Sequence, residues 1–279
     1  IVKNLYIDPD QPKDWEDTWG PSGEYRKNIF IYDAEKGHIK GELSISGIWG
    51  REMHDATVTE DGILMTTFVV EETETMNAFS FPDNTHQGSL NDITFSYDSE
   101  CPAFLGGNIF ASGSVNQGTA KIYATTESET ENYVYTFGMG APNKWDGFYT
   151  EEEFTISSSG KGHLAVKPDK SFYWNANGGK FLYCNGKQIS ESQSTLEGTA
   201  IRYILTQDGL DYLAVLNENK VDVYTLEPGK PDTKTLWASS PVLGNKPSIA
   251  GDIEIGIAAD NSPILYVLSA NNGFAAWKL

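Results

Sequence analysis

Apolar and polar residues alternate along most of the chain, in short runs that are separated by polar turns. Alternation with a period of two is typical of strands that have one buried face. Because Asp, Asn and Gly tolerate the positive φ of tight hairpins, turns that contain them predict that two neighbouring strands pair. Five stretches combine an alternating strand, such a polar turn and a second, more apolar strand: DATVTEDGILMTTFVV, NIFASGSVNQGTAKIYAT, HLAVKPDKSFYWNA, IRYILTQDGLDYLAVL and IEIGIAADNSPILYVLS. Each stretch therefore predicts a β-hairpin.

The five hairpins belong to a longer repeat. A third strand follows each of them, as in NYVYTF and KVDVYTLEPG, and outer strands such as IKGELSI and DTKTLWAS complete a four-stranded unit. The turn positions Asp61, Gln117, Asp169, Asp208 and Asp260 are spaced by 56, 52, 39 and 52 residues. A unit of about fifty residues is in the range of propeller blades.

The segment NIFIYDAEKG, which precedes the first hairpin, indicates one more unit at the N-terminus. No helical periodicity extends over more than a few residues. We therefore predict an all-β fold, a single β-propeller domain over residues 1–279 with blades of four-stranded antiparallel sheets. Six blades fit best, and five or seven remain open.

A propeller closes its ring by pairing or packing its first and last units, which removes exposed sheet edges. The C-terminal unit ends with its third strand, GFAAWKL. Its outer strand could be supplied by Val2–Ile7, which would join the N- and C-terminal strands. Alternatively, Val2–Ile7 forms the inner strand of the first blade.

Charge limits the partners of the chain. The 279 residues carry a net charge of −19, which repels a phosphate backbone and an anionic membrane surface. No apolar run approaches the roughly 20 residues of a membrane-spanning helix. We expect no nucleic-acid partner and no direct membrane insertion of this domain. The oligomeric state is left open.

The cysteines and the acidic N-terminal segment are the first places to look for a disulfide or a metal. Cys101 and Cys184 are the two cysteines, and whether they form a disulfide is left open. The chain has no CxxC or Cys/His spacing, so we expect no structural zinc site. Asp8, Asp10 and Asp14 could hold Ca²⁺ through their carboxylates. If Asp8 is counted as the first position of an EF-hand loop, the sixth position should be Gly, but Lys13 stands there. The alternative is therefore a solvated acidic loop, and we expect no cofactor.

Three loops look like connections between blades: Gly47–Asp55 (GIWGREMHD), Gly138–Glu153 and Ser240–Asp252. Such connections would open onto one face of the ring. Aromatic rings stack on the apolar face of a sugar, while charged groups bind its hydroxyls. The alternative is that the Trp rings fill the gaps between blades. The ligand-binding candidates on this face are Trp49, Arg51, His54, Trp145, Asp146 and Tyr149.

A second group of candidates lies where inner strands should begin. His163, like His54, stands at such a position, as do Arg202 and the pair Asp252 and Glu254. We include His163 and Arg202 among the ligand-binding residues. A His with carboxylates could also carry out general acid–base catalysis, and a structural role is the third interpretation. The chain contains no G-x-S-x-G, Walker or G-x-G-x-x-G motif.

The final string LYVLSANNGFAAWKL, with the hairpin EIGIAADNSPILYVLS, resembles the C-terminal blade of uncharacterised β-propeller proteins that gut Bacteroidetes export, often as lipoproteins. This resemblance implies a periplasmic or cell-surface propeller of six or seven blades with a link to glycan handling. It carries over no catalytic residue. The sialidase box S-x-D-x-G-x-T-W is absent, and Trp-Asp occurs once only.

These observations favour an exported, non-catalytic binding or scaffold propeller that recognises a glycan or a protein partner through loops on one face. One alternative is a carbohydrate-active hydrolase or lyase that uses carboxylates and a His near the ring axis. The other is a structural or adhesion module of a larger surface protein.

Overall fold

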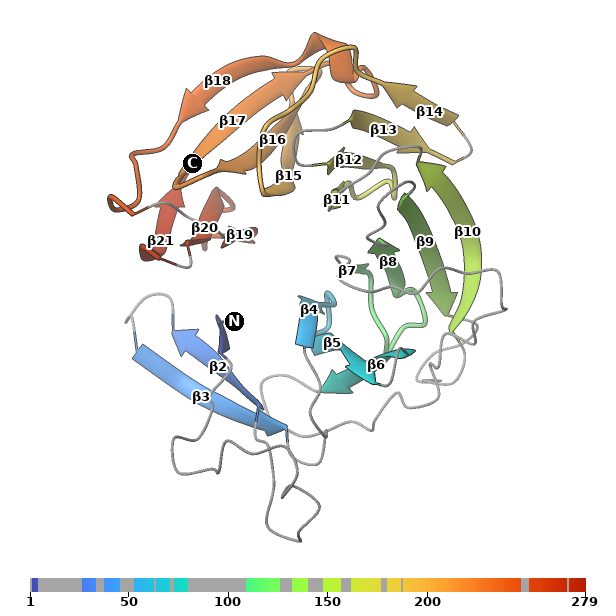
Figure 1. Ribbon diagram of the computed structural model, residues 1–279, viewed down its shortest axis with the longest axis vertical. Coiled ribbons are helices and arrows are strands. Elements are labelled where there is room, and N and C mark those ends of the chain that lie inside the picture. The colour runs from blue at the N-terminus through green and yellow to red at the C-terminus, as the bar shows by residue number, and fades with distance from the viewer. Residues whose placement is uncertain are drawn as a thin grey trace, which may run out of the picture.

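The chain forms antiparallel sheets arranged in a ring (Figure 1). The structure is a computed structural model that describes residues 2–4, 27–33, 38–45, 53–62, 64–70, 73–79, 109–125, 132–139, 148–156, 162–176, 180–186, 188–246, 251–269 and 271–279. Apart from the short 3₁₀ helix η3 (Pro231–Thr233), every regular element in these ranges is a strand. The prediction of an all-β propeller is confirmed.

Three of the sheets have the predicted four strands, and the strands of each follow one another in chain order. The first contains β7 (Ile109–Ser112), β8 (Lys121–Thr125), β9 (Asn132–Met139) and β10 (Phe148–Ile156). The second contains β11 (Gly162–Val166), β12 (Phe172–Ala176), β13 (Phe181–Asn185) and β14 (Gln188–Glu191). The third contains β15 (Ala200–Gln207), β16 (Leu210–Asn217), β17 (Lys220–Leu226) and β18 (Thr235–Ser239).

Three further sheets have three strands within the described ranges. One contains β1 (Val2–Asn4), β2 (Lys27–Asp33) and β3 (His38–Ile45). Another contains β4 (Met53–Val58), β5 (Leu64–Val70) and β6 (Thr73–Phe79). The last contains β19 (Gly251–Ile257), β20 (Pro263–Ser269) and β21 (Gly273–Lys278). The blade number of the whole chain stays a prediction.

The five predicted hairpins are all present, each as the first two strands of a sheet. The turn between β15 and β16 shows why the sequence folds there. Asp208 and Gly209 both have positive φ, 52° and 78°, as a two-residue hairpin turn of type I′ requires. Local turn chemistry and strand alternation therefore specify these pairings.

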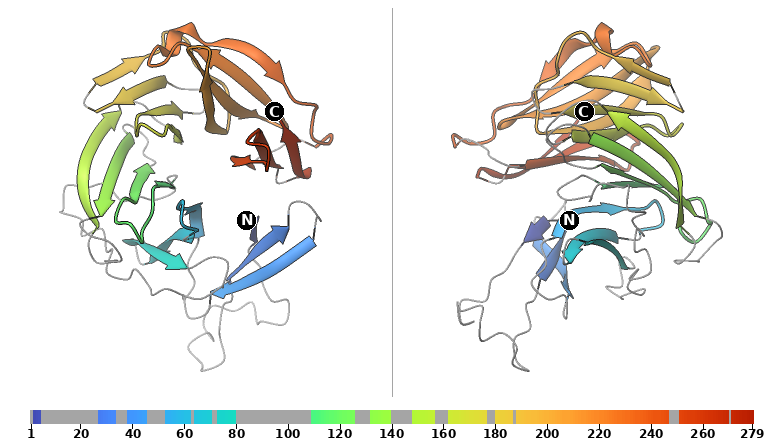
Figure 2. Two further views of the ribbon diagram at one scale, coloured as in Figure 1. Left: turned by 180° about the vertical axis from the view of Figure 1, so that it is seen from behind. Right: turned by 45° about the vertical axis from the view of Figure 1, so that its right-hand side comes forward.

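The first strand of each sheet lies innermost in the ring, and the last strand lies at its periphery (Figures 1 and 2). At the N-terminus, β1 pairs with β2, with Val2 opposite Phe30. This is the second of the two placements considered for Val2–Ile7, as an inner strand of the first sheet. Closure of the ring through its two terminal strands stays a prediction.

Apolar side chains fill the space between successive sheets. One glycine is needed for this packing, because a Cβ on Gly162 would overlap the ring of Trp174 on the neighbouring strand. Full burial of a large apolar side chain contributes roughly 1.5–3 kcal/mol, so these layers are the main source of stability. Between β11–β14 and β15–β18 the layer contains Ala165, Tyr173, Phe181, Ile201, Leu213 and Val215. Between β15–β18 and β19–β21 it contains Ala214, Leu216, Ile253, Leu265 and Val267.

Candidate functional site

Arg202 connects three successive inner strands. It belongs to β15, and its Nη1 donates to the carbonyl oxygens of Ile201, on its own strand, and Leu164, on β11, at 2.9 and 3.4 Å. Its Nε and Nη2 donate to Glu254 and Asp252 on β19, both at 3.3 Å. Innermost strands have one edge without a neighbouring strand, so a guanidinium with five donors is well suited to bind the groups there.

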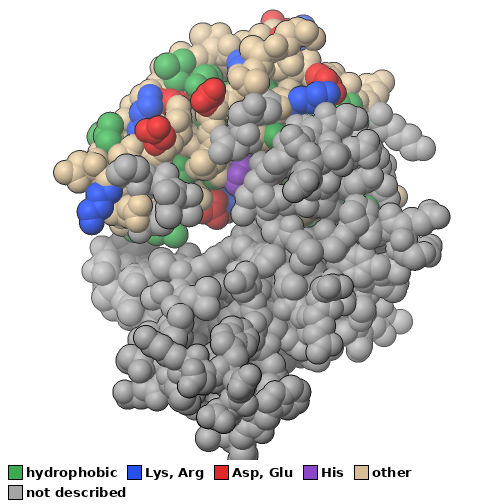
Figure 3. All heavy atoms as spheres, in the orientation of Figure 1, with side chains coloured by type: hydrophobic (Ala, Val, Ile, Leu, Met, Phe, Trp, Pro, Cys, Tyr) green, Lys and Arg blue, Asp and Glu red, His purple; other side chains and the backbone are tan. Residues whose placement is uncertain are grey.

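In this cluster the arginine side chain is buried, whereas the two acidic side chains are exposed to solvent. The Arg202 side chain is 9% exposed, whereas those of Asp252 and Glu254 are 47% and 61% exposed. The buried guanidinium therefore holds two carboxylates that remain accessible to solvent. Figure 3 shows acidic and basic side chains on the described part of one face of the molecule. Fixed carboxylates of this kind can accept hydrogen bonds from the hydroxyl or amino groups of a ligand.

A second polar group lies next to this cluster. His163 on β11 is buried, and it stands opposite Asn175 of β12, so both side chains lie on one face of the sheet. The Asn175 amide is fully buried, and neither its nitrogen nor its oxygen has a hydrogen-bond partner among the described residues. An amide without partners in the interior costs about 1–3 kcal/mol. Asn175 was not among the residues singled out from the sequence.

The prediction that His54, His163, Arg202 and the pair Asp252 and Glu254 begin inner strands is confirmed. They lie on β4, β11, β15 and β19, each the first strand of its sheet. The structure joins Arg202 to the two carboxylates, and it places His163 beside Leu164, whose carbonyl Arg202 binds.

The remaining candidates fall largely outside the described residues. Trp49, Arg51, Trp145 and Asp146 lie outside them, as do Asp8, Asp10, Asp14 and Cys101. Tyr149 is part of β10. Their roles in ligand binding and in calcium binding stay predictions, and the pairing of Cys101 stays open.

One loop assignment is wrong. Gly138–Glu153 does not connect two blades, because β9 and β10 pair within one sheet, with Gly138 opposite Tyr149. The loop is the link between a third and a fourth strand. Topology therefore gives no reason to place Trp145, Asp146 and Tyr149 on the face of Trp49. The Ser240–Asp252 connection does join two sheets, from β18 to β19, as predicted.

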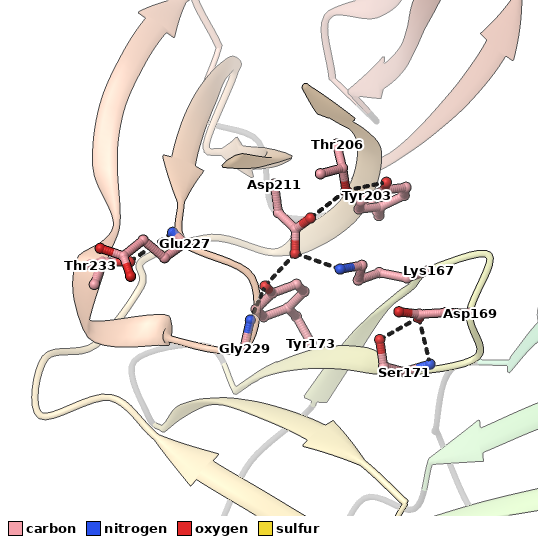
Figure 4. A network of polar contacts seen from close by, with 10 residues as sticks. All are labelled: Lys167, Asp169, Ser171, Tyr173, Tyr203, Thr206, Asp211, Glu227, Gly229 and Thr233. Atoms are coloured by element: carbon pink, nitrogen blue, oxygen red, sulfur yellow. Dashed lines mark hydrogen bonds and ion pairs between the residues drawn. The ribbon is translucent and has the colours of Figure 1, made fainter. Parts of the chain in front are cut away.

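A buried ion pair joins the sheets β11–β14 and β15–β18 (Figure 4). Lys167 Nζ lies 2.8 Å from Asp211 Oδ2, and the Asp211 side chain is fully buried. The same carboxylate accepts hydrogen bonds from the hydroxyl of Tyr173, at 2.6 Å, and from Thr206. The Tyr173 hydroxyl in turn accepts from the backbone N–H of Gly229, at 3.2 Å.

Electrostatics fix the protonation states in this network. Burial by itself would lower the pKa of Lys167, but the hydrogen bond and the charge of Asp211 outweigh it, so the pKa is raised. Burial, followed by the hydrogen bond to Asp211, raises the pKa of Tyr173 well above its ordinary value. The ammonium also lies 5.7 Å from the Tyr203 ring centroid. With Lys167 charged and Tyr173 neutral, this hydrogen-bond network joins the sheets β11–β14 and β15–β18.

Other reactive groups in the described part offer little chemistry. Cys184 is buried and forms no disulfide with another described residue, and burial raises the pKa of its thiol to about 12. Within the ranges given above, no group of three or more His, Cys, Asp or Glu side chains is arranged to hold a metal ion. The described part also has no helix that could span a membrane.

Comparison with known proteins gives the fold and no family. No protein-family model and no curated protein sequence matches the chain. A solved protein from Lactobacillus plantarum has a TM-score of 0.53 and 12% identity, and the match covers 92% of this chain and 82% of that one. A protein of unknown function from Bacteroides caccae has a TM-score of 0.52 and 10% identity, with 90% and 89% covered. A triple Arg-to-Ala mutant of AofleA from Arthrobotrys oligospora has a TM-score of 0.54 and 10% identity, with 92% and 77% covered.

The chain has the β-propeller fold. Identities this low show the fold alone, and they transfer neither site residues nor activity.

Proposed function

We propose that this propeller is a non-catalytic binding or scaffold module, exported to the periplasm or the cell surface, that recognises a glycan or a protein partner. The observation that carries the proposal is the pair of exposed carboxylates, Asp252 and Glu254, held on an inner strand by a buried arginine. Export, a lipoprotein anchor and membership of the Bacteroidetes family rest on the resemblance of the C-terminal blade.

Ligand binding fits this cluster better than catalysis does, because the guanidinium of Arg202 is already engaged in hydrogen bonds within the protein. The hydrogen bonds of Arg202 described above engage two backbone carbonyls and two carboxylates. The outward groups are then hydrogen-bond acceptors at fixed positions. A glycan, which presents many hydroxyl donors, matches such acceptors, and Trp49 and Trp145 supply candidate stacking rings.

The test is a glycan array probed with the intact chain, with its Trp49→Ala variant and with its Glu254→Gln variant. We expect one class of glycan to bind the parent, and each variant to bind that class at least tenfold more weakly. Glu197→Gln, an exposed carboxylate elsewhere, serves as the control. If no glycan binds and Trp49→Ala alters no measured interaction, glycan recognition is wrong and a protein partner remains.

The second candidate is a carbohydrate-active hydrolase or lyase, favoured by the same two carboxylates together with His163. Their joint use would make Glu254→Gln inactive on a polysaccharide substrate that the parent cleaves. Absence of cleavage by the parent on a broad polysaccharide panel would reject it.

A further inference from the structure

The described tryptophans differ in their surroundings, and Trp237 is the one that is mostly open to solvent. Trp174 is fully buried, and Trp277 packs against the layer between β15–β18 and β19–β21. Trp237 belongs to the outermost strand β18 and is 57% exposed. Because tryptophan rings are largely buried on average, this position needs an explanation of its own.

A β-bulge sets the direction of the Trp237 side chain. The register of β17 with β18 shifts after Val223, which stands opposite Ala238. The next residue of β17, Tyr224, stands opposite Leu236, so Trp237 is the extra residue of the bulge. A bulge leaves such a residue outside the regular pairing and can redirect its side chain.

The ring of Trp237 lies on the side of its sheet that faces β19–β21. Alternate residues of β16 pack toward the two neighbouring sheets, Leu213 toward β11–β14 and Ala214 toward β19–β21. Tyr212 therefore points to the β19–β21 side. Its ring meets the ring of Trp237 edge to face, with centroids 5.4 Å apart and an interplanar angle of 84°. This contact orients the indole and still leaves it accessible.

Neutral hydroxyl groups border the indole. Thr225 on β17 stands opposite both Tyr212 of β16 and Thr235 of β18, so these three side chains form a row on the face of Trp237. The strand β18, TLWAS, contains no charged residue. An accessible ring beside hydroxyl groups can stack on the apolar face of a sugar and form hydrogen bonds with its hydroxyls.

The size of this surface favours a sugar ring over a protein partner. Leu236, the other exposed large apolar residue of β18, stands opposite Tyr224, which packs toward β11–β14. Leu236 therefore lies on the opposite face from Trp237, and the two do not form one patch. One aromatic side chain buries roughly 150–250 Å², whereas a stable protein interface needs roughly 800 Å² per partner.

The connection that follows β18 runs toward the end of the sheet that is opposite to Tyr212. The N–H of Ser240 donates to the carbonyl of Val221 at 2.8 Å, and the N–H of Leu243 donates to the carbonyl of Asn219 at 2.6 Å. Both carbonyls lie near the turn between β16 and β17, whereas Tyr212 lies near the turn between β15 and β16. These bonds hold the connection away from the row of hydroxyl groups.

We propose that Trp237 is a stacking platform for a pyranose ring of a neutral glycan, with the hydroxyls of Thr225 and Thr235 beside it. The sugar has equatorial ring substituents, as in a β-1,4-linked glucan, because such a ring presents a flat C–H face to the indole. The platform lies on the periphery of the propeller (Figure 1), apart from the inner-strand cluster of Arg202. It is a second surface, and its test does not depend on that cluster.

The experiment titrates cellohexaose into the full chain labelled with 5-fluorotryptophan and follows the fluorine NMR resonances. The resonance that is lost in Trp237→Phe identifies Trp237, and we expect it to shift and saturate. Tyr212→Ala removes the edge contact and should raise the Kd by about threefold or more, whereas Tyr212→Phe should retain binding. Leu236→Ala, an exposed apolar position on the opposite face, is the matched control and should leave the Kd unchanged.

Calorimetry on the unlabelled chain gives the size of the effect, and we expect Trp237→Ala to weaken binding of cellohexaose at least tenfold. Shifts at the Trp49 or Trp145 resonances without one at Trp237 would place the glycan on the loops considered above and would overturn the platform. Absence of any shift with cellohexaose would overturn it as well. So would a Trp237 resonance that moves with protein concentration alone, because the ring then packs against a second copy.

Discussion

Two neighbouring interfaces of this propeller use ion pairs in opposite ways. Between β11–β14 and β15–β18, Lys167 and Asp211 are both buried, and Tyr173 and Thr206 complete the hydrogen bonds of the carboxylate. Between β15–β18 and β19–β21, only the cation, Arg202, is buried, and its partners remain open to solvent. The first pair is sealed inside an apolar layer, and the second lies at the inner edge of the ring.

This difference separates the pair that stabilises the fold from the pair whose charges are accessible to a ligand. A sealed pair has lost its hydration, so its members depend on each other completely, and removal of one leaves an uncompensated charge. A half-open pair loses less when it is broken, because water replaces the missing partner. The interface that is weaker in this sense is also the one whose charges a ligand can reach.

The largest effect is expected at the sealed pair. Asp211→Asn removes the charge that compensates buried Lys167, and we expect it to lower the free energy of unfolding by about 3–5 kcal/mol. Urea unfolding monitored by Trp fluorescence measures it. Asp208→Asn, an exposed position in the same hairpin, should change stability by less than about 0.5 kcal/mol. Equal losses of unfolding free energy in Asp211→Asn and Asp208→Asn would contradict the stabilising role of the buried pair.

An intermediate effect is expected at the buried arginine. Arg202→Gln leaves the carbonyls of Leu164 and Ile201 with fewer donors, while Asp252 and Glu254 gain hydration. We expect a loss of about 2 kcal/mol, less than for Asp211→Asn. Lys230→Gln, at an exposed ion pair, is the control in the same unfolding assay. A loss larger than that of Asp211→Asn would reverse the ranking of the two interfaces.

The smallest effect is expected at the open carboxylate. Glu254→Gln should cost about 1 kcal/mol or less, because exposed pairs are weak and screened by salt. In a double-mutant cycle, the coupling between Arg202 and Glu254 should shrink in 1 M NaCl. The Lys167–Asp211 coupling should persist there. If salt weakened the coupling energy of both ion pairs equally, the distinction between the buried pair and the solvent-exposed pair would be wrong.

The elements that sequence alone predicted are those whose information is local. Each hairpin carries its own alternation and turn residues, as Asp208 and Gly209 show, so all five could be predicted. Arg202 and the acidic pair could be grouped because they occupy the same place in successive repeats. The Gly138–Glu153 loop was misassigned because a polar loop does not reveal whether the strands beside it pair with each other.

The rest depends on contacts between distant residues. Lys167 and Asp211 lie 44 residues apart, and neither position carries a local signal that it is buried. The unpartnered amide of Asn175 follows from the packing of its sheet, within a strand that otherwise reads as ordinary core.

The contact between Gly162 and Trp174 has a consequence for how this sequence can diverge. Because a methyl group at position 162 and an indole at position 174 would occupy the same space, we expect the two positions to vary together. A related chain with any side chain at the first position is expected to have a smaller residue at the second. Such paired replacements would identify true relatives of this blade at identities where ordinary alignment fails.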